Sequence, residues 1–141
     1  MARTDALICD TSGLVAYFDV SDAYHAPVRD ALEGESGPFV VSPFVLAELD
    51  YLLATRRGAD MELAALTELA AGAWTIPTFD EGDVEAAATL VDRYRDQAIG
   101  LTDASLVVLA NRLRTRTVLT LDHRHFDVVR PLQGGRFRII P

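Results

Sequence analysis

Four acidic residues follow or interrupt apolar runs of this sequence, where a carboxylate is costly unless its charge is compensated. They are Asp10 after ALIC, Glu48 after VLA, Asp103 after GLT and Asp122 after VLTL. A divalent cation is a common partner for carboxylates at such positions, and a set of oxygen ligands suits Mg²⁺ or Mn²⁺. The types and positions of these side chains therefore indicate a candidate metal site.

Each of these acids also has an ordinary structural interpretation. Asp10 can cap the helix expected directly after it, although Thr11 and Ser12 can cap that helix equally well. Asp103 can interact favourably with the dipole of a helix N-terminus, and Asp122 can belong to a turn. No single position decides between a structural and a chemical role.

Glu48 is the acid for which the pattern says least. In the helical segment PFVLAELDYLL the apolar residues form one stripe, with Glu48 beyond one edge and Asp50 beyond the other. Periodicity does not choose between these two residues. A solvated residue at the boundary of the stripe is the ordinary interpretation of either.

Other reactive side chains carry weaker signals. Cys9 lies inside a predicted strand, where cysteine is usually a small core residue. His123 and His125 have a loose spacing for a zinc site, so a phosphate contact or plain solvation is the better interpretation. We interpret Asp127 as a surface charge and His25 as a surface helix residue.

The composition is that of a globular protein, with 141 residues of which 50% are hydrophobic and 8% aromatic. This length fits a single domain, residues 1–141. The one cysteine excludes an internal disulfide and is compatible with a reducing compartment. Since the opening MARTDALIC is too short and polar for a signal peptide, and no apolar run has the length of a membrane span, we expect a cytoplasmic protein.

The net charge of −8 argues at first against a nucleic-acid partner, because phosphate contacts normally need a basic surface. The charge is unevenly distributed, however. Residues 112–141 hold seven of the thirteen basic residues and have a balance of +5, whereas residues 1–111 have a balance of −13. All the basic residues are arginines, which suit phosphate but can equally reflect a codon bias. The clustering of basic residues in the final segment is therefore compatible with phosphate contacts.

Strand and helix patterns alternate along the chain. We expect strands at 6–9, 39–41, 74–76, 118–121 and 137–140, and helices at 11–18, 22–32, 43–57, 60–71, 80–97 and 102–113. Expected N-caps are Ser21 or Asp22, Asp80 and Thr102, with Asp83 placed to complete a capping box around Asp80. The alternation predicts the α/β class, as a three-layer α/β/α domain with a mainly parallel central sheet of about five strands.

Such a fold would bring two of the acids together. If the chain winds outward from its first strand and later returns to the other side of it, the first and fourth strands become neighbours. Ligands of open α/β sheets bind beyond the carboxyl ends of the strands, where the strand order reverses. Asp10 and Asp122 follow those two strands, so we expect them at the centre of the site.

Four segments together resemble the PIN-domain nucleases, specifically the VapC-like ribonuclease toxins of type II toxin–antitoxin systems. These segments are ICDTSGLVAYF, SPFVLAELDYLL, IGLTDASLVVLA and VLTLDHRHF, and they occur in the family's order between residues 6 and 126. The resemblance implies that Asp10, Glu48, Asp103 and Asp122 are catalytic and bind metal, and it favours Glu48 over Asp50. It also implies a hydroxyl role beside the first acid for Thr11 or Ser12, and for Thr120.

The resemblance further implies a function. It implies hydrolysis of RNA phosphodiester bonds with Mg²⁺ or Mn²⁺, by a toxin that inhibits growth or translation. A homodimer and a small antitoxin protein that covers the acidic site are implied as partners. The apolar surfaces of 45–53 and 61–69 are candidate contact regions, unless they form the core. The alternatives are a housekeeping PIN nuclease of RNA processing and a non-catalytic PIN-like domain that binds RNA or protein.

Two other folds also place carboxylates at the ends of strands. A phospho-accepting receiver domain uses a lysine after its last core strand, and this chain has no lysine. A haloacid-dehalogenase-like phosphatase has a second aspartate two residues after the first, where this chain has Ser12. Both classes therefore fit the sequence poorly.

Overall fold

The structure is a computed structural model that describes residues 6–141. Its strands are β1 (Leu7–Cys9), β2 (Phe39–Val41), β3 (Trp74–Thr75), β4 (Thr117–Leu119) and β5 (Arg138–Ile140). Its helices are α1 (Thr11–Phe18), α2 (His25–Glu33), α3 (Pro43–Arg57), α4 (Ala59–Ala70), α5 (Glu81–Arg93), α6 (Leu101–Arg112) and α7 (His123–Val128), with a short 3-10 helix, η1 (Arg95–Gln97), after α5.

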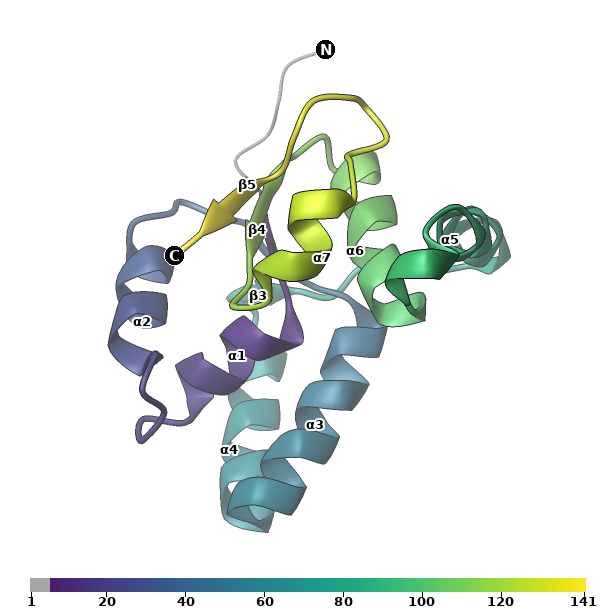
Figure 1. Ribbon diagram of the computed structural model, residues 1–141. Coiled ribbons are helices and arrows are strands. Elements are labelled where there is room, and N and C mark those ends of the chain that lie inside the picture. The colour runs from purple at the N-terminus through teal and green to yellow at the C-terminus, as the bar shows by residue number, and fades with distance from the viewer. Residues whose placement is uncertain (1–5) are drawn as a thin grey trace.

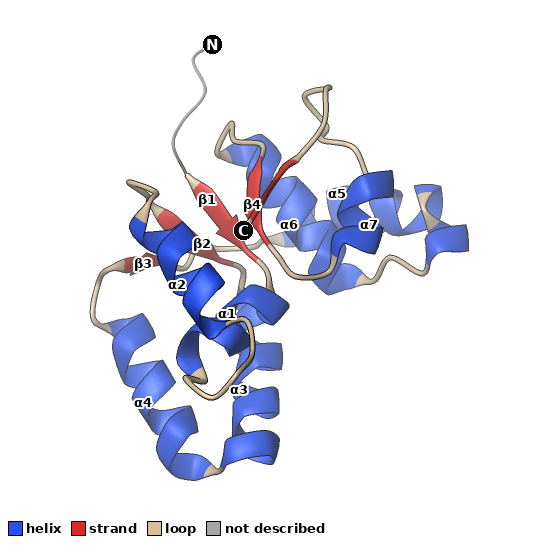
Figure 2. Ribbon diagram, turned by 60° about the vertical axis from the view of Figure 1, so that its left-hand side comes forward, coloured by secondary structure: helices blue, strands red, loops and turns tan. Residues whose placement is uncertain are grey.

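The strands form one parallel sheet in the order β3-β2-β1-β4-β5. The chain moves outward from β1 to β3 and then returns to β4 on the other side of β1 (Figure 1). Helices α1 to α4 lie on one side of the sheet and α5 to α7 on the other, as Figure 2 shows. The predicted α/β/α architecture is confirmed, and the strand order reverses between β1 and β4.

Strand β1, at the centre of the sheet, positions the carboxyl ends of its neighbours. Leu7, Ile8 and Cys9 are fully buried, as expected for a strand covered on both faces. Leu7 pairs with Phe39 of β2 and with Thr117 of β4, so the three strands end at the same level. The residues that follow β1 and β4 are therefore held side by side.

A glycine lets α1 approach this pair of strands. A Cβ atom at Gly13 would lie 2.8 Å from Cγ of Leu119, closer than side-chain carbons pack. Leu119 is fully buried at the end of β4 and has no free space to move into. The glycine of the CDTSG segment is therefore needed for the close contact between α1 and β4.

Most expected elements are present, and the boundaries of α3 are as predicted. Ser42 caps α3 through a hydrogen bond from the main-chain N–H of Phe44, Pro43 opens the helix and Gly58 ends it with a φ of 91°. The capping box of α5 between Asp80 and Asp83 is also confirmed. Val45, Leu49 and Leu53 of α3 are core residues, the alternative left open for 45–53, whereas Tyr51 in the same segment is exposed.

Three expectations about helices are wrong. Helix α2 begins at His25, because the Asp22 carboxylate accepts a hydrogen bond from the main-chain N–H of Tyr24 in the preceding turn. Thr102 is not a cap, since α6 already begins after Gly100. Helix α5 ends at Arg93 and η1 follows it, and Ala98, the residue after η1, lies in the left-handed region.

Helix α7 was not expected from the sequence. It contains six residues, and Phe126 is its only buried one. The Phe126 ring packs edge-on against Phe137 with ring centroids 5.7 Å apart, which fixes the helix beside β5. This tertiary contact, rather than an apolar stripe, defines α7.

Several arginines of the final segment have structural partners. Arg112 binds the Thr78 carbonyl and the Asp83 carboxylate, and Arg116 binds two carbonyls of the loop before β5. Arg138 pairs with Glu35. The positive balance of 112–141 is thus partly used to hold the fold together.

Among residues 6–141, none of the helices has the length and apolarity needed to cross a bilayer.

Candidate active site

Asp10 lies at the carboxyl end of β1 and is the N-cap residue of α1. Its main-chain N–H donates to the carbonyl of Leu119, which ties it to the end of β4. The main-chain N–H of Thr11 donates to its Oδ1 atom at 2.8 Å. The residue is only 6% exposed, so both the capping role and the strand-end position expected from the sequence are present.

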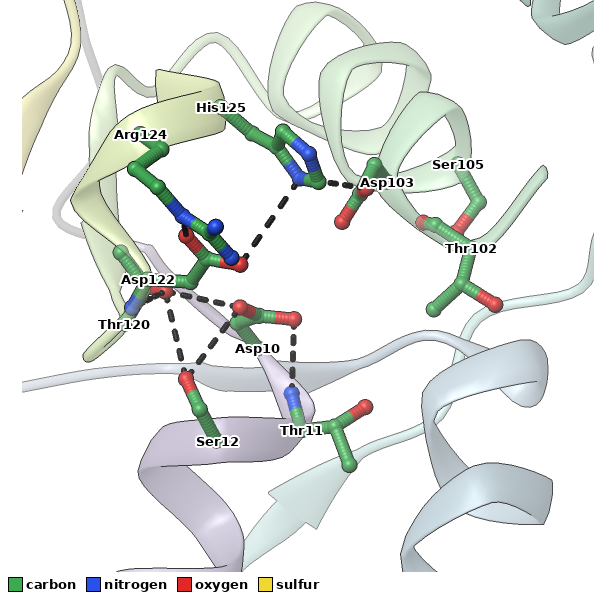
Figure 3. Close-up of polar contacts among 10 residues, drawn as sticks. All are labelled: Asp10, Thr11, Ser12, Thr102, Asp103, Ser105, Thr120, Asp122, Arg124 and His125. Carbon is green, nitrogen blue, oxygen red and sulfur yellow. Dashed lines mark hydrogen bonds and ion pairs between the residues drawn. The ribbon is translucent and has the colours of Figure 1, made fainter. Parts of the chain in front are cut away.

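Two hydroxyl groups surround the other oxygen of Asp10 (Figure 3). Thr120 Oγ1 donates to Oδ2 of Asp10 at 2.7 Å and accepts a hydrogen bond from the main-chain N–H of Asp122. Ser12 Oγ lies 3.4 Å from the same oxygen and accepts from the main-chain N–H of Leu121. This network joins the start of α1 to the segment after β4.

Thr11 differs from these two residues. Its hydroxyl oxygen is buried and has no hydrogen-bond partner within residues 6–141. Only its main-chain N–H contacts Asp10. Of the two hydroxyl candidates next to the first acid, the geometry therefore favours Ser12.

Asp103 enters the site from the first turn of α6. The start of this helix is attached to the end of β2, because Ser105 Oγ lies 2.8 Å from Ser42 Oγ in the core and donates to the carbonyl of Thr102. The Asp103 side chain is 24% exposed. Figure 3 shows it on the side of α6 that faces Asp10 and Asp122.

Asp122 lies between β4 and α7. Its Oδ1 atom is 3.3 Å from Nε of Arg124, an ion pair whose arginine is almost fully exposed. Its Oδ2 atom is 3.9 Å from Nδ1 of His125, and the same nitrogen is 2.9 Å from Oδ2 of Asp103. His125 thus stands between two of the predicted site acids (Figure 3).

The structure separates the two acids of α3 that the sequence could not. Glu48 is exposed, and its charge contributes to raising the pKa of both Asp10 and Asp103. Asp50 instead forms a hydrogen bond with Glu62 of α4, which raises the pKa of Glu62. Glu48 therefore belongs to the acidic cluster, whereas Asp50 faces the neighbouring helix.

The pKa values show that these carboxylates form one electrostatic group. Burial, together with the charges of Asp103 and Glu48, raises the pKa of Asp10 to about 6, against the opposing hydrogen bonds from Thr120 and Thr11. Burial also raises the pKa of Asp103, with contributions from Asp122 and Glu48, while His125 lowers it. The cluster thus carries more negative charge than its own hydrogen bonds compensate.

This donor set fits a hard divalent cation. Within residues 6–141, no three His, Cys, Asp or Glu side chains are gathered closely enough to hold a metal ion as they stand. The ligand chemistry is nevertheless suitable, because carboxylate oxygens alone suit Mg²⁺ or Mn²⁺ and their mutual repulsion is relieved by a cation. Side-chain rotation, for example of the exposed Glu48, would be needed for these acids to converge on one ion.

Cys9 has no chemical role in this arrangement. It is fully buried, and burial raises the pKa of its thiol far above the ordinary value. A thiolate is the reactive form of cysteine, so Cys9 is a core residue, as expected from its strand position.

Sequence reasoning missed two neighbours of the acids. Arg124 and His125 both contact Asp122, and His125 also contacts Asp103. The HRH triplet directly after Asp122 was a usable signal for both residues. Without α7, however, the direction of their side chains was not predictable.

Comparison with known proteins decides the family. The PIN domain profile matches residues 7–131, which include all four acids. The chain belongs to the PIN domain family. It is 54% identical to Ribonuclease VapC26 of Mycobacterium tuberculosis over 135 residues, which cover 96% of this chain and all of that protein.

Solved structures show the same fold. VapC20 of Mycobacterium tuberculosis, a sarcin–ricin loop cleaving toxin, superposes with a TM-score of 0.84 at 18% identity over 96% of this PIN domain chain and all of that chain. A chain of a toxin–antitoxin complex from Klebsiella pneumoniae gives a TM-score of 0.66 at 20% identity, covering 88% of this chain and 92% of that one. The resemblance inferred from four short segments is therefore confirmed.

Proposed function

We propose that this PIN domain protein is a metal-dependent endoribonuclease and the toxin of a toxin–antitoxin pair, acting on RNA in the cytoplasm. The observation that carries the proposal is the cluster of Asp10, Glu48, Asp103 and Asp122 at the point where the strand order reverses. The relation to Ribonuclease VapC26 over nearly the whole chain supports RNA as the substrate. The alternatives, an RNA-processing nuclease and a non-catalytic domain, have no such specific support.

In the proposed site all four acids bind Mg²⁺ or Mn²⁺. Asp10 and Asp122, from adjacent strands, are the expected central ligands, and Glu48 and Asp103 complete the set from helices. When bound, the cation lowers the pKa of a coordinated water and neutralises charge on the phosphate.

The hydroxyl groups keep the central carboxylate in place. Thr120 and Ser12 hold Oδ2 of Asp10, and the Thr11 main-chain N–H holds Oδ1. A carboxylate fixed on both oxygens presents its remaining lone pairs in one direction. The chain therefore preorganises Asp10 before any ligand binds.

The exposed Arg124 is suited to bind the phosphate backbone beside the cut. It lies next to the acids and its side chain is 87% exposed. A guanidinium binds phosphate oxygens through paired N–H groups. The sequence was compatible with phosphate contacts along the whole arginine-rich segment. We restrict this role to Arg124, because Arg112, Arg116 and Arg138 bind other parts of the fold.

A groove of this protein, away from the acidic cluster, is a candidate binding site for the antitoxin. This groove has a volume of about 840 Å³ and lies between α1, α2 and α4. Trp74 forms its aromatic wall with Tyr17, Phe18 and Phe39, at ring-centroid distances of 5.6, 6.2 and 5.6 Å. The ionisable lining residues include Glu33, Glu35, Glu68, Arg29 and His25.

An apolar groove with an excess of glutamates suits an amphipathic segment with basic residues. We propose that such a segment of the antitoxin occupies it, as expected for a relative of a chain solved in a toxin–antitoxin complex. Met61, Ala64 and Ala65 of α4 line the groove, so part of the second contact region suggested by the sequence is accessible. We further propose that the protein forms a homodimer, which light scattering of the purified protein tests.

The proposed function is tested by inducible expression in a bacterial host, with new RNA 5′ ends mapped after induction. The wild type should arrest growth and produce new ends at a small set of sites. The Asp10→Asn variant should do neither at the same protein level. New ends in equal number for both proteins would contradict the proposal.

A further inference from the structure

His125 lies between Asp103 and Asp122, two of the four acids. It is half-buried, and its Nδ1 atom lies 2.9 Å from Oδ2 of Asp103 and 3.9 Å from Oδ2 of Asp122. A carboxylate can only accept a hydrogen bond, so the proton of the shorter contact is on Nδ1. A neutral imidazole in this tautomer is sufficient for the contact.

The two residues of this contact come from different helices. His125 belongs to α7 and Asp103 to α6. Phe126, the next residue in α7, is buried against Phe137, and the main-chain N–H of Val129 closes the helix on the carbonyl of His125. The backbone that carries His125 is therefore positioned by the packing of α7, independently of the Asp103 side chain.

A fixed donor of this kind selects one orientation of its acceptor. An aspartate in the first turn of a helix has several accessible rotamers, and the neighbouring carboxylates Asp122 and Glu48 repel it. A hydrogen bond to Oδ2 offsets this repulsion and leaves Oδ1 of Asp103 for a cation or its water. Outer hydrogen bonds of this type orient metal ligands, and their loss typically lowers metal affinity by about 10–100-fold.

We propose that His125 is a positioning residue that orients Asp103 for metal binding through its Nδ1–H group. This inference rests on the proposed metal site. The sequence indicated a phosphate contact or plain solvation for His125, whereas its Nδ1 atom lies 2.9 Å from Oδ2 of Asp103. His125 acts here through Asp103 and not on the RNA.

Two amide variants test whether the hydrogen-bond donor must lie at the position of Nδ1 or whether any polar side chain is enough. The side-chain nitrogen of His125→Asn occupies nearly the same place as Nδ1, whereas that of His125→Gln lies one methylene further out. Both variants are uncharged and polar, and His125→Ala removes the donor. His123→Asn is the matched control, because His123 is an exposed histidine of the same helix.

The experiment measures Mn²⁺ affinity by calorimetry for each full-length variant at one pH, with thermal unfolding in EDTA as a check of folding. His125→Ala and His125→Gln should bind Mn²⁺ about 10–100-fold more weakly than the wild type, and His125→Asn within about threefold of it. His123→Asn should match the wild type. Cleavage of RNA by His125→Ala should recover when Mn²⁺ is raised to saturation, because only the orientation of a ligand is lost.

The results distinguish this inference from the proposed function. Equal Mn²⁺ affinity of the wild type and His125→Ala overturns the positioning role while leaving the metal site in place. Equal affinity of His125→Asn and His125→Gln also overturns it, since polarity alone would then be enough. Absence of Mn²⁺ binding by the folded wild type overturns the proposed metal site and the inference with it.

Discussion

Thr120 Oγ1 lies 2.7 Å from Asp10 Oδ2 and links the ends of the two central strands, β1 and β4. The contact joins residues 110 positions apart in the chain, and it is made where the strand order reverses. A buried carboxylate there needs donors to remain charged. Thr120 supplies the hydrogen bond that most strongly opposes the effect of burial on the pKa of Asp10.

Replacement of Thr120 by valine should therefore make Asp10 harder to ionise. A hydrogen bond to a charged group is worth roughly 1.5–3 kcal/mol, which corresponds to about 1–2 pKa units. The pH at which Mn²⁺ affinity falls to half should rise accordingly, measured by calorimetry between pH 5 and 8. Thr120→Ser keeps the hydroxyl and should follow the wild-type profile. An unchanged profile in Thr120→Val would show that this hydroxyl does not support the charge of Asp10.

Ionisation of Asp10 should lower the stability of the metal-free protein. The pKa of Asp10 is about 6 in the folded protein and 3.8 without the fold. The folded state then binds this proton more tightly, so the contribution of Asp10 to stability is greatest below pH 3.8 and declines until about pH 6. The expected loss from Asp10 is on the order of 3 kcal/mol.

Urea unfolding in EDTA at several pH values tests this dependence. Asp10→Asn lacks the titrating group, so its advantage in stability over the wild type should be larger at pH 7 than at pH 4. Mg²⁺ should stabilise the wild type at pH 7 and have little effect on the variant. A stability difference that does not change with pH would mean that Asp10 is not protonated in this range.

The part of the site that depends on strands was predictable from the sequence. Asp10 and Asp122 follow apolar runs, and the carboxyl ends of parallel strands meet at one edge of a sheet. The alternation of strands and helices therefore predicted that these two residues lie close together. Helix α3 was predictable because Pro43 and Gly58 mark its ends through local backbone geometry. These signals act within a few residues.

The remaining part depends on contacts distant in the sequence. Glu48 and Asp50 are equivalent on a helical wheel, and their neighbours in the fold separate them, because Glu48 contributes to the raised pKa of Asp10 and Asp103 whereas Asp50 raises that of Glu62. The contact of His125 with Asp103 was not predictable because α7 has no apolar periodicity and depends on the contact of Phe126 with Phe137. Local patterns contain no information on such partners.

Gly13 should be intolerant of even a methyl group. In Gly13→Ala the new Cβ would meet the buried Leu119 side chain at 2.8 Å, and overpacking of this kind typically costs about 1–3 kcal/mol. Urea unfolding should show this loss of stability. Gly82→Ala is the control, because Gly82 is an exposed helix position where alanine is neutral or stabilising. If Gly13→Ala proved as stable as Gly82→Ala, the close approach of α1 to β4 would not be required.

Binding of the antitoxin should be visible in the fluorescence of Trp74, the only tryptophan of the chain. Burial of this ring by an apolar segment should shift its emission to shorter wavelength. Ala64→Arg places a charge in the groove and should weaken binding by roughly tenfold or more. Ala70→Arg, also on α4 and exposed, should bind normally. Antitoxin binding with no response of Trp74 and no effect of Ala64→Arg would exclude this groove.

The most direct test of the central claim is RNA cleavage by purified protein, compared between the wild type and Asp10→Asn in Mg²⁺ or Mn²⁺ and in EDTA. The account predicts cleavage by the wild type that EDTA abolishes, and a folded Asp10→Asn variant with at least about 100-fold lower activity, as expected when a central metal ligand is lost. Cleavage by Asp10→Asn at the wild-type rate, or cleavage that persists in EDTA, would contradict the assignment of these acids as a metal-dependent nuclease site.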